Sequence, residues 1–293
     1  MPDSVERQKF RARGRADLPL DDIQEAIPCV LMDIKALKPV LPAVEALDDP
    51  VFLGRSLGFF NWMFAHYFRV EVIGLEQLPA GASLLVSNHG GFIPWDGAMI
   101  HAAIWRAKGR HPRFLVTSWA FTVKGLGGFL RRTGNVPASP ETAARLLAQG
   151  EIVGTFPEGV DGVAKPLWRR YQPERFREGF ARLALKQRVP IVPISVVGSE
   201  DSYPIVANWA WLGRKLGGEA LPITLFWPWL GPLGLFPLPV KWIIRIHAPV
   251  NVPPLPASEG FDTTTVSRVA RQVERTIDEG VQAARRWRHF LFF

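Results

Sequence analysis

His89 and Asp96 are the residues of this sequence whose types and spacing most directly indicate chemistry. They stand seven positions apart, and the turn between them contains two glycines and a proline. The apolar run at residues 83–86 is typical of a buried strand, and Pro94 suits the first turn of a following helix. A carboxylate that holds a histidine fixes its tautomer and makes it a better general base. The pair therefore predicts a group that takes a proton from a hydroxyl.

A structural role is the alternative for both residues. His89 would then be a histidine at a strand end with its hydrogen bonds satisfied. Asp96 would be an acid at a helix N-terminus, where the helix dipole favours a negative charge. Short motifs also match by chance, so the choice depends on what else the chain contains.

Two further apolar runs each end in a motif. Residues 152–156 predict a strand that enters a tight turn with a carboxylate, and residues 189–198 contain a Val-Pro-Ile-Val-Pro run. With these boxes in this order, residues 70–255 resemble the glycerophospholipid acyltransferases, which carry a His…Asp box, a Phe-Pro-Glu-Gly box and a Val-Pro-x-Val-Pro strand. The resemblance implies that the second of these motifs shapes the acceptor pocket, through Phe156, Pro157, Glu158 and Gly159.

The sequence departs from the family pattern in the first box. Six residues separate His89 from Asp96, where the family usually has four. Longer loops of this kind resemble the branch near the mono- and diacylglycerol acyltransferases.

A second departure concerns the arginines that hold an acceptor phosphate in the family. The second box of the family corresponds here to residues 134–139, which begin with Gly134 and Asn135. This box has no arginine at its end, where the family usually has one. Val160 and Asp161 follow the Phe-Pro-Glu-Gly box where arginine is usual. Because a bidentate arginine–phosphate contact is hard to replace, a glycerol-3-phosphate or lysophosphatidate acceptor is in doubt.

Three cations lie close downstream of these boxes. Lys165, Arg169 and Arg170 are candidates for binding the substrate in place of the missing arginines. The alternative is a solvated basic face without a role in binding.

The resemblance implies an O-acyltransferase similar to the 1-acylglycerol-3-phosphate acyltransferases. His89 would accept the proton of a glycerolipid or lysophospholipid hydroxyl while the oxygen attacks an acyl thioester, and Asp96 would hold the imidazole. The donor would be acyl-CoA or an acyl-carrier protein, with no cofactor. Backbone N–H groups at Gly90, Gly91 and the turn at Gly134 are candidates for stabilising the oxyanion.

Two other functions fit part of the pattern. A non-catalytic lipid-binding protein of the same fold would not need both His89 and Asp96. A thioester or ester hydrolase would need a nucleophile beside His89, and Ser87 is the only near candidate, without a Gly-x-Ser-x-Gly elbow.

Composition favours a lipid surface as the partner. The chain has 293 residues, of which 47% are hydrophobic, and it carries a net charge of +8 with 11 tryptophans and 19 phenylalanines. Its basic residues are dispersed and no nucleic-acid module is evident, so nucleic acid is not an expected partner. Cys29 is the single cysteine, and the histidines lack metal-ligand spacing, so we expect no disulfide within the chain and no metal site. We expect peripheral or monotopic association with the cytoplasmic face of a membrane.

Three segments are candidates for contact with that membrane. Residues 50–67 predict an apolar helix with basic residues that lies on the membrane or belongs to the core. Residues 221–240 lack charge but contain five prolines, which predicts an irregular loop that dips into lipid or packs on the sheet. The basic and aromatic tail at residues 285–293 either binds anionic lipid or packs as the end of the last helix.

The order of elements predicts an α/β fold, with a layered sheet flanked by helices. Expected strands lie at residues 70–72, 84–87, 114–117, 152–156, 191–197 and 242–247, and expected helices at residues 96–108, 139–150, 173–188 and 263–288. We divide the chain into an N-terminal helical, membrane-associating segment at residues 1–69 and an acyltransferase domain at residues 70–293.

Overall fold

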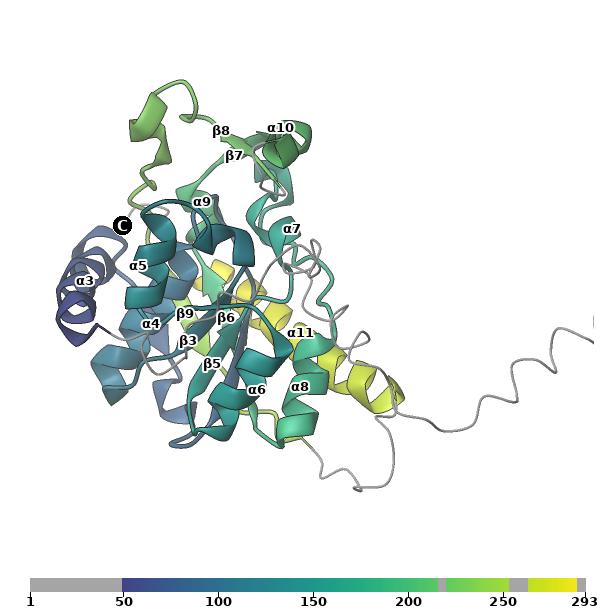
Figure 1. Cartoon of the computed structure of the whole chain (residues 1–293). Coiled ribbons are helices and arrows are strands. Elements are labelled where there is room, and N and C mark those ends of the chain that lie inside the picture. Colours follow the sequence, from purple (N-terminus) through teal and green to yellow (C-terminus); the bar gives the residue numbers. More distant parts are fainter. Residues whose placement is uncertain (1–48, 216–219, 253–262, 289–293) are drawn as a thin grey trace, which may run out of the picture.

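A mixed sheet of seven strands forms the centre of the fold, in the order β1-β9-β6-β2-β5-β3-β4 (Figure 1). The computed structural model describes residues 49–215, 220–252 and 263–288. Strands β6, β2, β5, β3 and β4 are parallel, β9 is antiparallel to β6, and β1 is parallel to β9. The strands are β1 (Glu71–Ile73), β2 (Ser83–Ser87), β3 (Arg113–Val116), β4 (Val136–Pro137), β5 (Ile152–Thr155), β6 (Ile191–Val197) and β9 (Ile243–Ile246).

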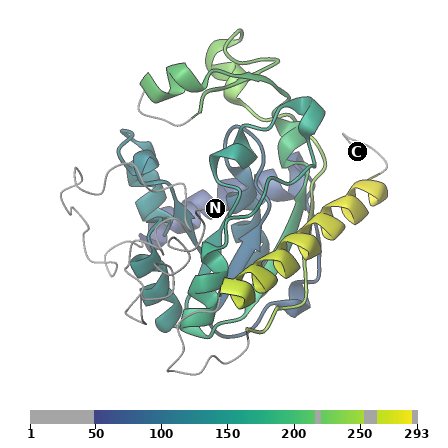
Figure 2. The same ribbon diagram turned by 90° about the vertical axis from the view of Figure 1, so that its right-hand side faces the viewer.

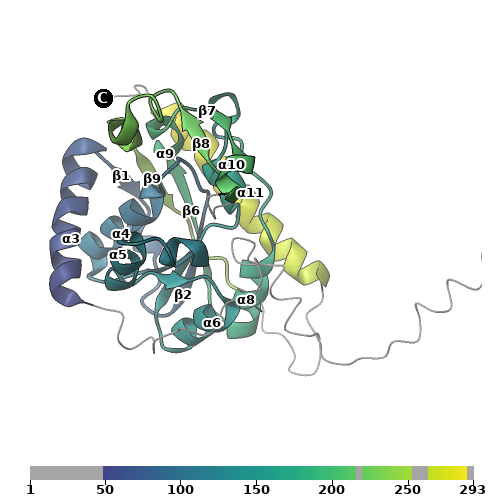
Figure 3. The same ribbon diagram turned by 45° about the horizontal axis from the view of Figure 1, so that its top comes forward.

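Helices cover both faces of the sheet and make three layers. One face packs on α6, α8 and α11, and the other packs on α4 and α3, as the views in Figures 1, 2 and 3 show. The helices are α3 (Pro50–Trp62), α4 (Trp95–Lys108), α5 (Leu126–Arg132), α6 (Pro140–Ala148), α7 (Val160–Val163), α8 (Gly179–Gln187), α9 (Ser199–Ser202), α10 (Ala210–Lys215) and α11 (Thr263–Trp287).

The central strands are apolar on both faces because both faces are covered. In β2, Leu84 and Val86 pack towards α6, α8 and α11, whereas Leu85 packs towards α4. All seven residues of β6 are buried. This burial explains why these strands appear in the sequence as continuous apolar runs rather than alternating ones.

The predicted α/β architecture is confirmed, and most predicted elements are present with small shifts at their ends. The strand at residues 191–197 has the predicted bounds, and the helix predicted from residue 139 begins with Ser139 as its cap, whose Oγ accepts the Thr142 N–H at 3.0 Å. The helix predicted at residues 173–188 is wrong in its first part, because α8 begins only at Gly179.

The helix predicted at residues 50–67 is present, and part of it is packed in the core. It consists of α3 and a π-helical turn, Met63–Tyr67. Leu53 and Leu57 are buried in the protein, whereas Phe59 and Trp62 are about half exposed at 49% and 52%. One face of this segment therefore belongs to the core, and the other exposes Phe59 and Trp62 together with Arg55 and His66.

Residues 221–240 are more regular than a loop. Their first part forms β8 (Pro222–Thr224), which pairs antiparallel with β7 (Ile205–Asn208) above the sheet in Figure 1, and Gly231–Leu235 form a 3-10 helix. Within the described ranges, no helix combines the length and the apolar character needed to cross a membrane.

Parts of the predicted terminal segments lie outside the described residues. These are residues 1–48 of the N-terminal segment and residues 289–293 of the tail. The boundary between residues 69 and 70 stays a prediction. In the described part of the tail, Arg288 binds Asp201, which fits a packed helix end, whereas Trp287 is exposed.

Candidate active site

Three neighbouring parallel strands bring the candidate residues to one edge of the sheet. The strands lie in the order β6-β2-β5, and all three end at this edge. His89 follows β2, Glu158 follows β5 and Glu200 follows β6. This edge, beyond the carboxyl ends of parallel strands, is where open α/β sheets bind their ligands.

The His89 and Asp96 side chains meet as the sequence predicts. His89 Nδ1 lies 2.6 Å from Asp96 Oδ2, and the Asp96 side chain is fully buried. Asp96 Oδ2 also accepts the Gly90 N–H at 3.1 Å, and Oδ1 accepts the Gly97 N–H at 2.8 Å. These three donors and the N-terminus of α4 stabilise the buried negative charge.

This contact determines which nitrogen of His89 carries the proton. A carboxylate only accepts hydrogen bonds, so the Nδ1 of His89 must be the donor. In the neutral ring, Nε2 then keeps its lone pair and can accept a proton. The His89 side chain is 12% exposed, so the ring is held by the protein without being sealed from its surroundings.

The motif after β5 holds His89 from two sides. The Phe156 ring stacks on the His89 ring with centroids 4.2 Å apart and planes 18° apart. Glu158 Oε1 accepts the His89 backbone N–H at 2.8 Å. Behind them, a Cβ added at Gly162 would lie 2.9 Å from the Cβ atoms of both His89 and Glu158, so α7 packs closely on this pair.

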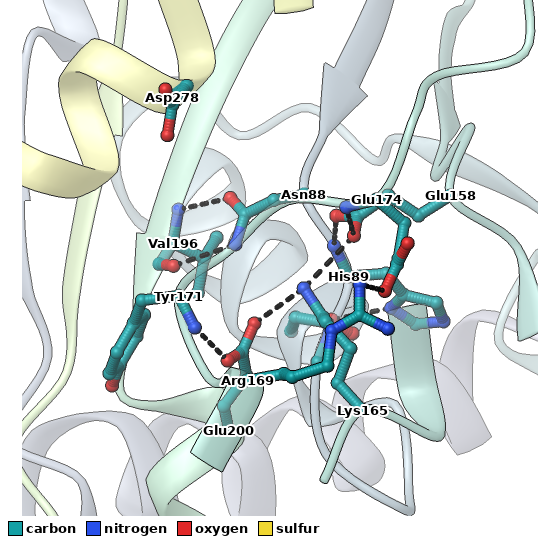
Figure 4. A network of polar contacts seen from close by, with 12 residues as sticks. Asn88, His89, Glu158, Lys165, Arg169, Tyr171, Glu174, Val196, Glu200 and Asp278 are labelled. Carbon is teal, nitrogen blue, oxygen red and sulfur yellow. Dashed lines mark hydrogen bonds and ion pairs between the residues drawn. The ribbon is translucent and has the colours of Figure 1, made fainter. Parts of the chain in front are cut away.

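Lys165 lies between two carboxylates next to this pair (Figure 4). Its Nζ is 3.0 Å from Glu158 Oε2 and 2.7 Å from Glu200 Oε1, and its side chain is only 2% exposed. Burial disfavours the charged form of Lys165, but the attraction of Glu158 and Glu200 outweighs it and raises the pKa of the lysine. Burial raises the pKa of Glu200, and the attraction of Lys165 limits that rise. A solvated position is therefore wrong for Lys165.

A second group of contacts continues from Glu200 to α11. Glu200 Oε2 accepts the Tyr171 N–H at 2.5 Å, and Tyr171 Oη donates to Asp201 Oδ2 at 2.5 Å. Burial, together with the Asp201 charge, raises the pKa of Tyr171 well above its usual range. Arg288, just after α11, donates to the same Asp201 carboxylate.

The two candidate arginines lie at the margin of this network. Arg169 is half exposed and binds Glu174 at 2.7 Å, and Arg170 is similarly exposed and lies 3.4 Å from Asp201. Both arginines therefore already face a carboxylate, and their exposure fits the alternative of a solvated basic face.

The predicted oxyanion donors are wrong at two of their positions. The Gly90 N–H donates to Asp96 and the Gly134 N–H donates to the Arg131 carbonyl. Asn135 is equally local, because its N–H donates to the Leu130 carbonyl and its side chain to Thr133. These contacts show no link from Gly134 or Asn135 to His89.

Sequence reasoning missed Glu200 and the part played by Asn88. Asn88 is buried and bridges β2 to β6, donating to the Val196 carbonyl at 2.9 Å and accepting its N–H at 2.8 Å. The available signal was position, since Glu200 and Asp201 come shortly after the end of the Val-Pro-Ile-Val-Pro strand at Val197. Such polar residues gather where parallel strands end.

The position of Ser87 does not support the hydrolase alternative. Its side chain is buried, and its hydroxyl donates to the Asn88 carbonyl at 3.0 Å. The part of the chain that the structure describes also contains no cluster of three or more His, Cys, Asp and Glu side chains placed to hold a metal ion.

Comparison with known proteins agrees with the resemblance seen in the motifs. Residues 69–197 match the family model described as Acyltransferase. An uncharacterized protein of Mycobacterium leprae is 37% identical over 253 residues, which span 84% of this chain and 68% of that protein. A mouse protein named a DGAT1/2-independent enzyme synthesizing storage lipids is 27% identical over 204 residues, or 66% of this chain and 56% of the relative.

A solved structure shares the fold. The crystal structure of the 1-acyl-sn-glycerophosphate acyltransferase PlsC from Thermotoga maritima superimposes with a TM-score of 0.52, at 21% identity, over 80% of this chain and 77% of PlsC. The matched family model spans β2, β5 and β6 together with the loops that carry His89, Asp96 and Glu158. The chain belongs to the acyltransferase family.

Proposed function

We propose that this acyltransferase moves a fatty acyl group from an acyl-CoA or acyl-carrier-protein thioester to the hydroxyl of a glycerolipid or lysophospholipid, with His89 as the general base. The observation that carries the proposal is the buried Asp96 carboxylate 2.6 Å from His89 Nδ1, which leaves Nε2 to accept a proton.

The reaction needs no covalent intermediate on the protein. His89 Nε2 takes the proton of the acceptor hydroxyl while that oxygen forms a bond to the thioester carbonyl carbon. The tetrahedral intermediate then expels the thiolate, and the imidazolium returns the proton to the sulfur. Asp96 stabilises the imidazolium between these steps, and general-base help of this kind contributes about 10²–10⁴-fold to the rate.

An apolar surface made of exposed side chains on two segments supports action at a membrane. It comprises Phe59 and Trp62 of α3 and side chains of the segment after β8, and the Tyr67 ring links Trp62 to that segment. The Trp62 and Tyr67 rings are 6.1 Å apart and the Tyr67 and Phe236 rings 5.4 Å apart. Its other members in that segment are the exposed Leu230 and Leu233. Exposed aromatic and aliphatic side chains on a basic protein suit the interfacial region of a bilayer.

The same segment touches the loop between His89 and Asp96. The Phe92 ring lies 5.3 Å from the Trp227 ring, and Tyr203 Oη, which accepts from Trp95 Nε1 at 2.9 Å, donates to the Leu235 carbonyl at 2.9 Å. A lipid bound at this surface would therefore be close to the proposed base. Because the thioester donors are cytoplasmic molecules, we place the reaction on the cytoplasmic face.

The experiment is a transfer assay with the full chain in lipid vesicles. Purified protein is incubated with labelled acyl-CoA and a panel of lysolipids and acylglycerols, and the labelled lipids are identified. We expect an esterified lipid product that depends on the acceptor. Release of free fatty acid at the same rate with and without acceptor would instead establish a hydrolase.

A further inference from the structure

The charge balance around Lys165 bears on which acceptor the site can take. Lys165 is linked to the proposed base through Glu158, which accepts the His89 N–H, and its ammonium lies between Glu158 and Glu200. Two carboxylates therefore share one lysine beyond the ends of β5 and β6, and the buried Asp96 carboxylate adds a third negative charge on the other side of His89. An acceptor phosphate would have to displace a carboxylate from Lys165 and approach the remaining negative charges.

The exposed arginines nearby are also matched with carboxylates. Arg169 binds Glu174, Arg170 faces Asp201, and Arg177 lies 3.6 Å from Asp161. Asp161 is the second residue after the Phe-Pro-Glu-Gly box, and its side chain is 67% exposed. At the position where the family resemblance implies a phosphate-binding arginine, this chain presents a solvent-accessible negative charge.

The role of Lys165 is then explained without a ligand. Glu158 also accepts the Glu174 N–H at 2.9 Å and the His89 N–H. It therefore connects these two loops and positions the base. A buried carboxylate is stable only when its charge is compensated. Lys165 supplies that compensation and ties Glu158 to Glu200, which packs against Gly90 so closely that a Cβ there would lie 2.4 Å from Glu200 Cγ.

We propose that the acceptor is a lipid alcohol without a phosphate, of the neutral acylglycerol class, and that Lys165 serves as the counter-ion of Glu158 and Glu200 rather than as a phosphate ligand. This inference rests on the proposed acyl transfer.

The test compares two acceptors that differ in the phosphate. Purified full chain is given labelled acyl-CoA with either a monoacylglycerol or a lysophosphatidate of the same acyl chain, both in neutral detergent micelles. We expect kcat/KM to favour the monoacylglycerol by about tenfold or more, because an unpaired or repelled phosphate costs more than one charge-assisted hydrogen bond. Equal or faster transfer to lysophosphatidate overturns the inference.

A charge reversal at an exposed position tests the cause. Asp161→Arg places a cation after the box, and we expect it to raise the ratio of lysophosphatidate to monoacylglycerol transfer by about tenfold. Asp161→Asn removes the charge without adding a cation and should raise this ratio less. An unchanged ratio in Asp161→Arg contradicts the electrostatic cause.

The two proposals fail in different ways. If lysophosphatidate is acylated well in a reaction that depends on His89, the acyl transfer stands and the neutral acceptor is wrong. If neither acceptor nor any other lipid alcohol is acylated, the proposed function is wrong and the inference falls with it.

Discussion

At the scale of single residues, Asp96 decides what His89 can do. Its carboxylate accepts from His89 Nδ1 and from two backbone N–H groups, and it has no exposed surface. An amide in the same place has a similar shape but can donate a hydrogen bond. Replacing the acid therefore tests the orientation and tautomer of the histidine without removing the ring.

We expect Asp96→Asn to lower kcat by about 10²–10⁴-fold, because the amide favours the tautomer that has its proton on Nε2. KM should change much less. The measurement is steady-state acyl transfer, with the thermal midpoint recorded to show that the variant is folded. Asp278→Asn on α11, whose side chain accepts from Gln282 at 3.2 Å, is the matched control. A drop in kcat of less than about tenfold would show that Asp96 has only a structural role.

The residue pattern predicted this dyad but not the network beside it. His89 and Asp96 lie at the two ends of one short loop, so their spacing alone indicates that they can meet. Lys165 and Glu200 come from segments after different strands, and their contact depends on the order β6-β2-β5, which local sequence does not encode. For this reason the local sequence does not distinguish Lys165 from the basic residues near it, and it does not indicate a role for Glu200.

At the scale of elements, α11 is attached to the sheet by a buried polar contact. Ser195 on β6 donates to the Ile277 carbonyl at 2.9 Å, and its oxygen lies 2.8 Å from His247 Nε2, just after β9. Since the serine proton is already used, His247 Nε2 must donate. Gly280 allows the close approach, because a Cβ there would lie 2.2 Å from Ser195 Oγ.

This contact makes stability depend on pH. Burial, aided by the Arg245 charge, lowers the pKa of His247 from 6.5 to about 4. The unfolded chain therefore binds a proton as the pH falls through 6.5 while the folded chain does not, so stability is complete above that pH and is lost towards pH 4.

Between about pH 7 and about pH 5 we expect His247 to remove about 1–2 kcal/mol from the free energy of unfolding, after allowance for partial solvent screening. Urea unfolding of wild type and His247→Gln at both pH values measures it. The glutamine amide can still donate to Ser195, so the variant should show a smaller loss. Identical losses in both proteins would assign the pH dependence to other groups.

The elements could be predicted where local sequence signals determine the structure. They could not be predicted where backbone groups form hydrogen bonds with distant residues of the site. The cap at Ser139 and the apolar run of β6 are local, and both predictions hold. Residues 173–178 are not helical because their backbone groups have partners elsewhere: the Glu174 N–H binds Glu158 and the Arg177 N–H binds the Pro157 carbonyl. Periodicity cannot show such long-range competition.

At the scale of the whole molecule, the apolar surface defined by Phe59, Trp62, Leu230, Leu233 and Phe236 lies beside the loop that carries the proposed base. Leu230 and Leu233 are 56% and 78% exposed, so their removal should not disturb the core. Exposed apolar groups of this size each contribute about 1–2 kcal/mol when they enter lipid.

The double variant Leu230→Ser, Leu233→Ser should bind neutral vesicles about tenfold or more weakly than wild type. Vesicle co-sedimentation over a range of lipid concentrations gives the partition coefficient. Trp287→Ser, on the exposed end of α11, is the comparison. If that variant loses binding and the double variant does not, the C-terminal helix rather than the apolar surface contacts the membrane.

The most direct test of the central claim is the rate of labelled acyl transfer to a lipid hydroxyl by His89→Gln, measured beside wild type. His111→Gln is the matched control, since His111 lies before β3, at the opposite edge of the sheet. We expect His89→Gln to lose about 10²–10⁴-fold in kcat and to stay folded, and we expect the control to keep its rate. Full acyl transfer by His89→Gln would contradict the assignment of the base and the mechanism that depends on it.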